Sequence, residues 1–140
     1  MRPIVYILLS IFIMSACGKY DEGPDFSLKT KKSRLHGDWE LKAAFINGSL
    51  QTSTNYIKYN FSKDGYFGLT VMDNSSGQYL NIQDGTWEFI DKKEFLRLKY
   101  LSNGQVVQLV EWKLLRLTNK DFFVEYEDNA DKIRMEFKKQ

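Results

Sequence analysis

The chain has 140 residues, of which 43% are hydrophobic and 15% aromatic, so it is long and apolar enough to bury the core of one domain. Its formal charge is only +2, and acidic and basic residues are interleaved along the sequence. This pattern gives no basic patch for nucleic acid and no acidic block for cations. One globular domain is therefore predicted, and nucleic acid is excluded as a partner.

The first residues have the pattern of an export signal. Arg2 supplies a positive charge, and an apolar run of eleven residues follows from Ile4 to Met14, too short to span a bilayer. Small residues then precede Cys17, the single cysteine of the chain. Residues 14–17 resemble the lipobox of bacterial lipoproteins, and the resemblance implies cleavage before Cys17 and acylation of that residue.

The alternative is an ordinary signal peptide, which would leave Cys17 as a free thiol in an oxidising compartment. Lipidation accounts for both the position and the singularity of the cysteine. We therefore expect residues 1–16 to be a lipoprotein signal peptide. The protein would then be held at a membrane, most simply the outer membrane of the cell envelope, through acylated Cys17.

Residues 17–33 contain Gly, Pro and scattered charges without a sustained period, which predicts a flexible tether. Its segment Lys-Tyr-Asp-Glu at residues 19–22 resembles the short export signals that send lipoproteins of Bacteroidetes to the cell surface. A solvated linker carries the same residue types, so both the periplasmic and the outer face stay open.

From residue 34 to residue 140 apolar and polar residues alternate, which is typical of half-buried β-strands. Eight such runs, separated by turn-forming residues, are predicted at 38–46, 55–62, 66–72, 78–90, 94–101, 105–117, 121–127 and 133–138. In the first run the alternation assigns four side chains to one face, namely Trp39, Leu41, Ala43 and Phe45.

Two of the runs are expected to be irregular. Asp84-Gly85 in the middle of the fourth run predicts a bulge or sharp bend. The sixth run is long, and a bulge within it would bring Trp112 and Leu114 onto the same face as Leu117. No helix is predicted after the signal peptide.

Eight antiparallel strands on short turns either leave two exposed edges or close on themselves. The number favours closure, because about eight strands enclose an interior that side chains fill or that holds one small ligand. We therefore expect residues 34–140 to form an all-β, eight-stranded antiparallel up-and-down barrel.

The meander opens with Gly37-Asp38-Trp39 in a chain that begins with a lipobox, and this combination resembles the lipocalin-like domains found as short lipoproteins in Bacteroidetes. The resemblance implies that Gly37 and Trp39 plug the closed end of the barrel beneath a basic residue of the last strand. Arg134 stands where that residue is expected, and Arg116 is the alternative. A cation over the indole would seal this end.

Catalytic chemistry has little support in the sequence. His36 is the single histidine, which excludes multi-histidine metal sites and a Ser-His-Asp triad. Four acidic residues surround one predicted turn, and they would suit paired carboxylates or calcium: Glu125, Glu127, Asp128 and Asp131. Nearby basic residues make a solvated turn the simpler interpretation. We expect no enzyme, no metal site and no cofactor.

Two functions remain after these exclusions. In the first, the barrel binds a small apolar or amphipathic ligand in a cavity lined by Trp87, Phe89, Leu96, Leu98 and Trp112. In the second, the barrel is filled and the protein is an interaction or accessory subunit at the outer membrane surface. Outward aromatic residues such as Tyr56, Tyr66 and Phe123 would then form its docking patch.

Overall fold

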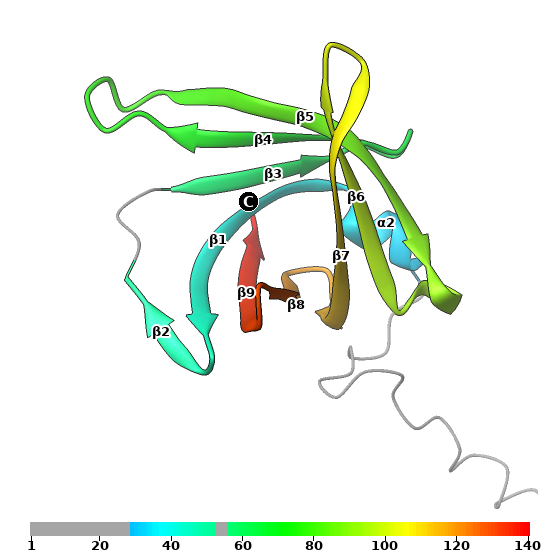
Figure 1. The fold of residues 1–140 in the computed structure, drawn as a ribbon. Coiled ribbons are helices and arrows are strands. Elements are labelled where there is room, and N and C mark those ends of the chain that lie inside the picture. Colours follow the sequence, from blue (N-terminus) through cyan, green and yellow to red (C-terminus); the bar gives the residue numbers. More distant parts are fainter. Residues whose placement is uncertain (1–28, 53–55) are drawn as a thin grey trace, which may run out of the picture.

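A computed structural model describes residues 29–52 and 56–140 of the chain (Figure 1). The predicted signal peptide, the predicted lipidation site Cys17 and the tether up to residue 28 lie outside the described residues. Within the described part, no helix is long and apolar enough to cross a membrane.

The described chain consists of strands, one short α-helix and one 3₁₀ turn. The helix is α2 (Lys31–Leu35), and the turn is η1 (Asp91–Lys93). The strands are β1 (Gly37–Ile46), β2 (Ser49–Gln51), β3 (Ile57–Phe61), β4 (Tyr66–Met72), β5 (Tyr79–Ile90), β6 (Phe95–Ser102), β7 (Gln105–Leu117), β8 (Asp121–Asp128) and β9 (Asp131–Lys139). All eight predicted strands are present, and β2 is an additional one.

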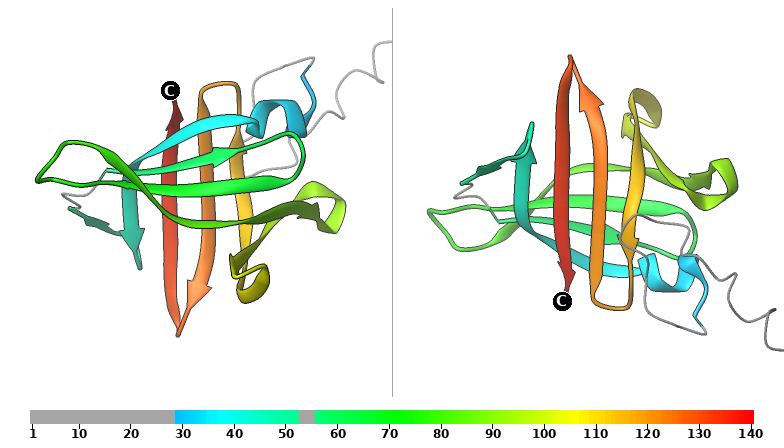
Figure 2. Two further views of the ribbon diagram at one scale, coloured as in Figure 1. Left: turned by 90° about the horizontal axis from the view of Figure 1, so that it is seen from above. Right: turned by 90° about the horizontal axis from the view of Figure 1, so that it is seen from below.

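The strands form one antiparallel sheet in which β3 to β9 follow each other in chain order and β9 pairs with β1. β3 pairs with the first half of β1, and the short β2 pairs with its second half on the same edge. β8 and β9 cross β3 and β4 steeply on the opposite wall (Figure 2). The predicted closed up-and-down barrel, the arrangement found in lipocalins, is therefore confirmed.

The prediction that one face of the first strand carries Trp39, Leu41, Ala43 and Phe45 is correct up to Leu41 and wrong beyond it. The pairing of β1 with β9 shifts between Leu41 and Ala43, which marks a bulge at Lys42. Beyond the bulge Phe45 pairs with Arg134, whose neighbour Met135 packs against the core. Phe45 therefore lies on the outer face, because one extra residue in a strand reverses the side to which later residues point.

Of the two other predicted irregularities, the bulge in the sixth run is present, and the one in the fourth run lies two residues from its predicted position. The pairing of β7 with β8 shifts between Leu114 and Arg116, so that Leu114, Trp112 and Leu117 are all buried as predicted. In β5 the extra residue is Ile82, opposite Leu69 and Thr70, whereas Asp84 and Gly85 pair regularly with β4 and β6. Both bulges keep long, strongly coiled strands in contact with the interior.

The absence of a helix was a wrong prediction, because α2 occupies part of the expected tether. The Thr30 hydroxyl accepts a hydrogen bond from the Ser33 amide at 3.1 Å and caps the helix N-terminus. Leu35, the last residue of α2, is fully buried in the core. A helix this short is stabilised by docking rather than by propensity.

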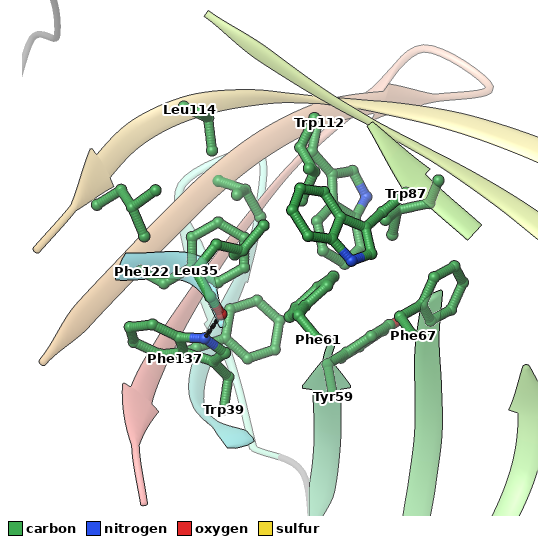
Figure 3. Packing of buried hydrophobic residues seen from close by; sticks show 14 residues of the cluster. Leu35, Trp39, Tyr59, Phe61, Phe67, Trp87, Trp112, Leu114, Phe122 and Phe137 are labelled. Carbon is green, nitrogen blue, oxygen red and sulfur yellow. Dashed lines mark hydrogen bonds between the residues drawn. The ribbon is translucent and has the colours of Figure 1, made fainter. Parts of the chain in front are cut away.

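The core consists mainly of aromatic rings packed against Leu and Val side chains. Tyr59 contacts Trp112 and Phe137 edge to face, with ring centroids 5.3 and 5.7 Å apart. Phe67 packs over Gly85, where an added Cβ would lie 2.4 Å from the ring. Figure 3 shows rings from opposite walls meeting in the interior, so the half of the barrel next to α2 is solid.

Candidate functional site

One end of the barrel is closed by Trp39 and α2. Trp39 is fully buried, and its indole Nε1 donates a hydrogen bond of 2.6 Å to the Leu35 carbonyl at the end of the helix (Figure 3). Its ring lies 5.5 Å from that of Phe122. This hydrogen bond explains how the helix is held across the barrel end.

The cation over Trp39 is Lys139 and not Arg134. The Lys139 ammonium lies 4.9 Å from the indole centroid and donates to the carbonyls of Arg34, at 2.8 Å, and His36. Gly37 has φ +120°, and a Cβ there would come within 2.9 Å of the Lys139 Cε. The glycine of the Gly-x-Trp sequence is therefore needed for its backbone conformation, and it leaves room for the lysine side chain beside it.

Arg134 lies elsewhere because the β1–β9 register pairs it with Phe45, whereas Trp39 pairs with Lys139. Its guanidinium binds Glu136 at 2.9 Å and lies 5.7 Å from the Phe123 ring on the outer face. Arg116 lies on the same outer ring, at 5.8 Å. Neither arginine reaches the plug, so this expectation for Arg134 and its alternative is corrected.

Most of the expected ligand-lining residues instead fill the core. Leu96 and Leu98 are fully buried, and the Trp87 indole donates to the carbonyls of Ser62 and Tyr66, both at 3.1 Å. Phe89 packs edge to face on Trp87 with centroids 5.5 Å apart. Of the five residues only Trp112 lines the pocket described next.

A pocket of about 510 Å³ lies at the open end of the barrel, opposite α2. Its wall is formed by Trp112, Tyr59, Tyr100, Tyr126 and Met135. Gln108, Val110 and several residues at the strand ends complete it. Trp112 and Tyr59 are buried and form its floor, whereas Tyr100 and Tyr126 are half-buried. The barrel is therefore solid at one end and hollow at the other.

The three tyrosines give the pocket a polar side. The hydroxyls of Tyr59 and Tyr100 lie 3.1 Å apart and share a hydrogen bond. Burial raises the pKa of Tyr59 far above its usual range, with a smaller contribution from Tyr100. Burial also raises the pKa of Tyr100 and of Tyr126, the latter with added repulsion from Tyr100 and Asp128. All three phenols are neutral hydrogen-bonding groups at physiological pH.

Sequence reasoning missed Tyr59, Tyr100, Tyr126 and Gln108 as site residues. Each alternates in phase with core residues of its own strand, so its inward direction was readable. Which end of the barrel each residue reaches depends on register and bulges between strands distant in sequence. No local signal carries that information.

In the described part of the chain, the acidic turn and His36 do not come together into a metal site. Glu125 binds Lys132 at 3.0 Å on the outer face, and Asp128 lies opposite Asp131 across the β8–β9 turn. No group of three or more His, Cys, Asp or Glu side chains in the described residues could hold a metal ion. His36 is the C-cap of α2, at the closed end.

No protein-family model and no curated protein matches the chain. Among solved structures, the chain is similar to apocrustacyanin C2 with a TM-score of 0.43 and 13% sequence identity. The match covers 76% of this chain and 61% of that protein, so the chain spans less than two thirds of its length. The strand order and closure described above define the fold independently of this match.

Proposed function

We propose that this protein is a carrier that binds one small apolar or amphipathic molecule in the open end of its barrel. The observation that carries the proposal is the pocket of about 510 Å³ above Trp112, a volume within the range of small-molecule sites. Its aromatic rings offer apolar surface, and the phenol hydroxyls offer a few fixed polar contacts. A ligand with an apolar body and one polar group matches this lining.

The proposed role is binding without catalysis. Raised pKa values keep Tyr59, Tyr100 and Tyr126 protonated, so these phenols are poor general bases near neutral pH. The single histidine, His36, lies at the opposite end of the barrel. A fixed hydrogen-bonding wall without a poised base suits retention of a ligand better than its conversion.

We further propose that the carrier is a lipoprotein of the cell envelope, anchored in the outer membrane through acylated Cys17. The lipobox resemblance supports the anchor, and the chain geometry is compatible with it. The described chain enters the barrel through α2, at the closed end. An anchor joined there would leave the mouth of the pocket free to exchange ligand.

The accessory-subunit alternative is not favoured, because it requires a filled barrel. Its outer aromatic residues are also dispersed. Tyr56, just before β3, is 51% exposed, and Tyr66, at the start of β4, is 60% exposed. Phe123 lies on β8, and the guanidinium groups of Arg116 and Arg134 cover its ring. The hollow end gives the carrier a site, and these aromatic residues do not make one for a partner.

Native mass spectrometry of protein extracted from its own cells tests the carrier function. A small-molecule adduct is expected on the wild type and should be lost in Gln108→Trp, which fills the mouth at an exposed position. Gln105→Trp is the matched control, because it adds the same ring to the same strand outside the pocket. Absence of any adduct on the wild type and on the control would reject the carrier function.

The anchor is tested separately by Cys17→Ala. The substitution should abolish incorporation of labelled fatty acid and release the protein from membranes, because no other acylation site is proposed. Continued labelling of the variant would show that the lipobox interpretation is wrong. If the anchor is present, protease treatment of intact cells distinguishes the periplasmic from the outer face.

A further inference from the structure

The mouth of the pocket carries charge of one sign. Three of its lining residues are acidic, Glu111, Glu127 and Asp128, and none of the described lining residues is Lys or Arg. A pocket built for a fatty acid or another carboxylate would need at least one cation or a set of amide donors at its polar end. The lining provides no cation, and Gln108 is its one amide side chain.

The basic side chains of the surrounding strands point away from the pocket. Arg97 and Lys99 alternate with the inward residue Tyr100 on β6 and bind Glu111 and Glu88 at 2.7 and 2.9 Å. Lys132 on β9 binds Glu125 at 3.0 Å. These cations pair with acids on the outer face. Arg97 thereby neutralises Glu111, so that Glu127 and Asp128 are the two lining acids to which these ion pairs do not extend.

Asp128 is the acid whose charge acts on the pocket interior. It stands two residues after Tyr126 at the end of β8, so both side chains lie on the same side of the strand. Its carboxylate accepts a hydrogen bond of 3.1 Å from the neutral Asn129 side chain. Its negative charge contributes to the raised pKa of Tyr126, after burial and Tyr100.

The aromatic wall adds to the same preference. The ring faces of Tyr and Trp are electron-rich and attract organic cations, most strongly where water is excluded. Trp112 is buried, and its ring stacks on Tyr126 and Phe137 with centroids 6.3 and 6.1 Å apart. The half-buried rings of Tyr100 and Tyr126 are therefore the ones that a head group in the pocket can reach. A cationic head at this level would meet ring faces and phenol oxygens with Asp128 at the rim.

We propose that the pocket selects amphiphiles with a cationic head group, a primary amine or a quaternary ammonium, over amphiphiles with a carboxylate. This inference rests on the proposed carrier function and specifies its ligand class. A carboxylate at the same position would face Asp128 without a counter-ion. A neutral head group would neither gain nor lose from this charge, so it should bind with intermediate affinity.

The inference is tested with three probes of equal tail length: octyltrimethylammonium, octanol and octanoate. Their binding to the full-length chain captured on a sensor surface is measured at neutral pH. The cation should bind roughly tenfold more tightly than octanoate. The cation gains the attraction of one surface ion pair with Asp128, and octanoate suffers a repulsion of similar size, so the two terms add in the difference in binding free energy. The preference should weaken in high salt, because Asp128 is exposed.

Asp128→Asn should reduce the preference for the cation over octanoate to about threefold. Asp64→Asn is the matched control, since this aspartate lies in the β3–β4 turn at the closed end. Octanoate binding as tightly as the cation would overturn the inference while the carrier function stands. Failure of all three probes would overturn the carrier function as well. A preference unchanged in Asp128→Asn would overturn the role given to this residue.

Discussion

The two ends of this barrel are built from the same alternating strands, yet they differ in what their side chains do. At the closed end Trp39 and Leu35 are fully buried and joined by a hydrogen bond. At the open end Tyr100 and Tyr126 are only half-buried around a pocket of about 510 Å³. Stability should therefore reside mainly at the closed end, and binding at the open end.

The largest expected effect is the loss of the plug. Trp39→Ala should lower the free energy of unfolding by about 3–5 kcal/mol, because it leaves a cavity and removes the partner of the Leu35 carbonyl. Chemical denaturation measures the change. Tyr126→Ala, which removes a half-buried ring at the open end, should cost less than half as much. Equal losses for the two variants would contradict the division of roles between the ends.

The boundary between the two halves lies at Gly85. Gly85→Ala should destabilise the barrel by about 1–3 kcal/mol through overpacking, because the new methyl would meet both the Phe67 ring and the Lys99 carbonyl at 2.4 Å. Phe67 is 5.1 Å from Tyr100, so ligand affinity should fall together with the melting temperature. Gly68→Ala is the matched control on β4, since an added Cβ there would meet only the Asp84 Oδ1, at an ordinary contact distance of 3.5 Å.

The tyrosine pair should respond asymmetrically. Tyr100→Phe leaves the buried Tyr59 hydroxyl without its partner and should cost about 1–2 kcal/mol of stability. Tyr59→Phe should cost less, because the half-buried Tyr100 hydroxyl can turn to water in the pocket. Thermal unfolding of both variants measures the difference. A larger loss for Tyr59→Phe would show that the pocket is closed to water.

The smallest expected effect is a pH dependence at the closed end. Asp121 accepts a hydrogen bond from Lys138, and this contact, aided by Arg116, lowers the pKa of Asp121 below its usual range. This contribution to stability is present above the ordinary aspartate pKa of about 3.9 and is lost as the pH falls through the lowered value. The free energy of unfolding of the wild type should therefore exceed that of Asp121→Asn by up to about 1 kcal/mol at neutral pH, and this difference should disappear in acid. Chemical denaturation at several pH values measures it. A constant difference would argue against the ion pair.

Local pattern alone determined most of the fold. The period of two predicted all eight barrel strands, and the length of β7 predicted its bulge at Leu115. The Gly-x-Trp sequence correctly indicated a buried Trp39 at the head of β1. These features depend on residues close in sequence, where alternation and turn chemistry act directly.

The tertiary structure decided which residues meet. The bulge at Lys42 moved Phe45 outward, and the β1–β9 register brought Lys139 rather than Arg134 to Trp39. The stagger of the closed sheet likewise sent Trp87 into the solid core and gathered the tyrosines around the pocket. A shift of one residue between strands reverses every side chain that follows, and the pairing energies that fix such shifts come from strands far apart in sequence. The sequence by itself therefore specified a barrel, and only its closure created the site.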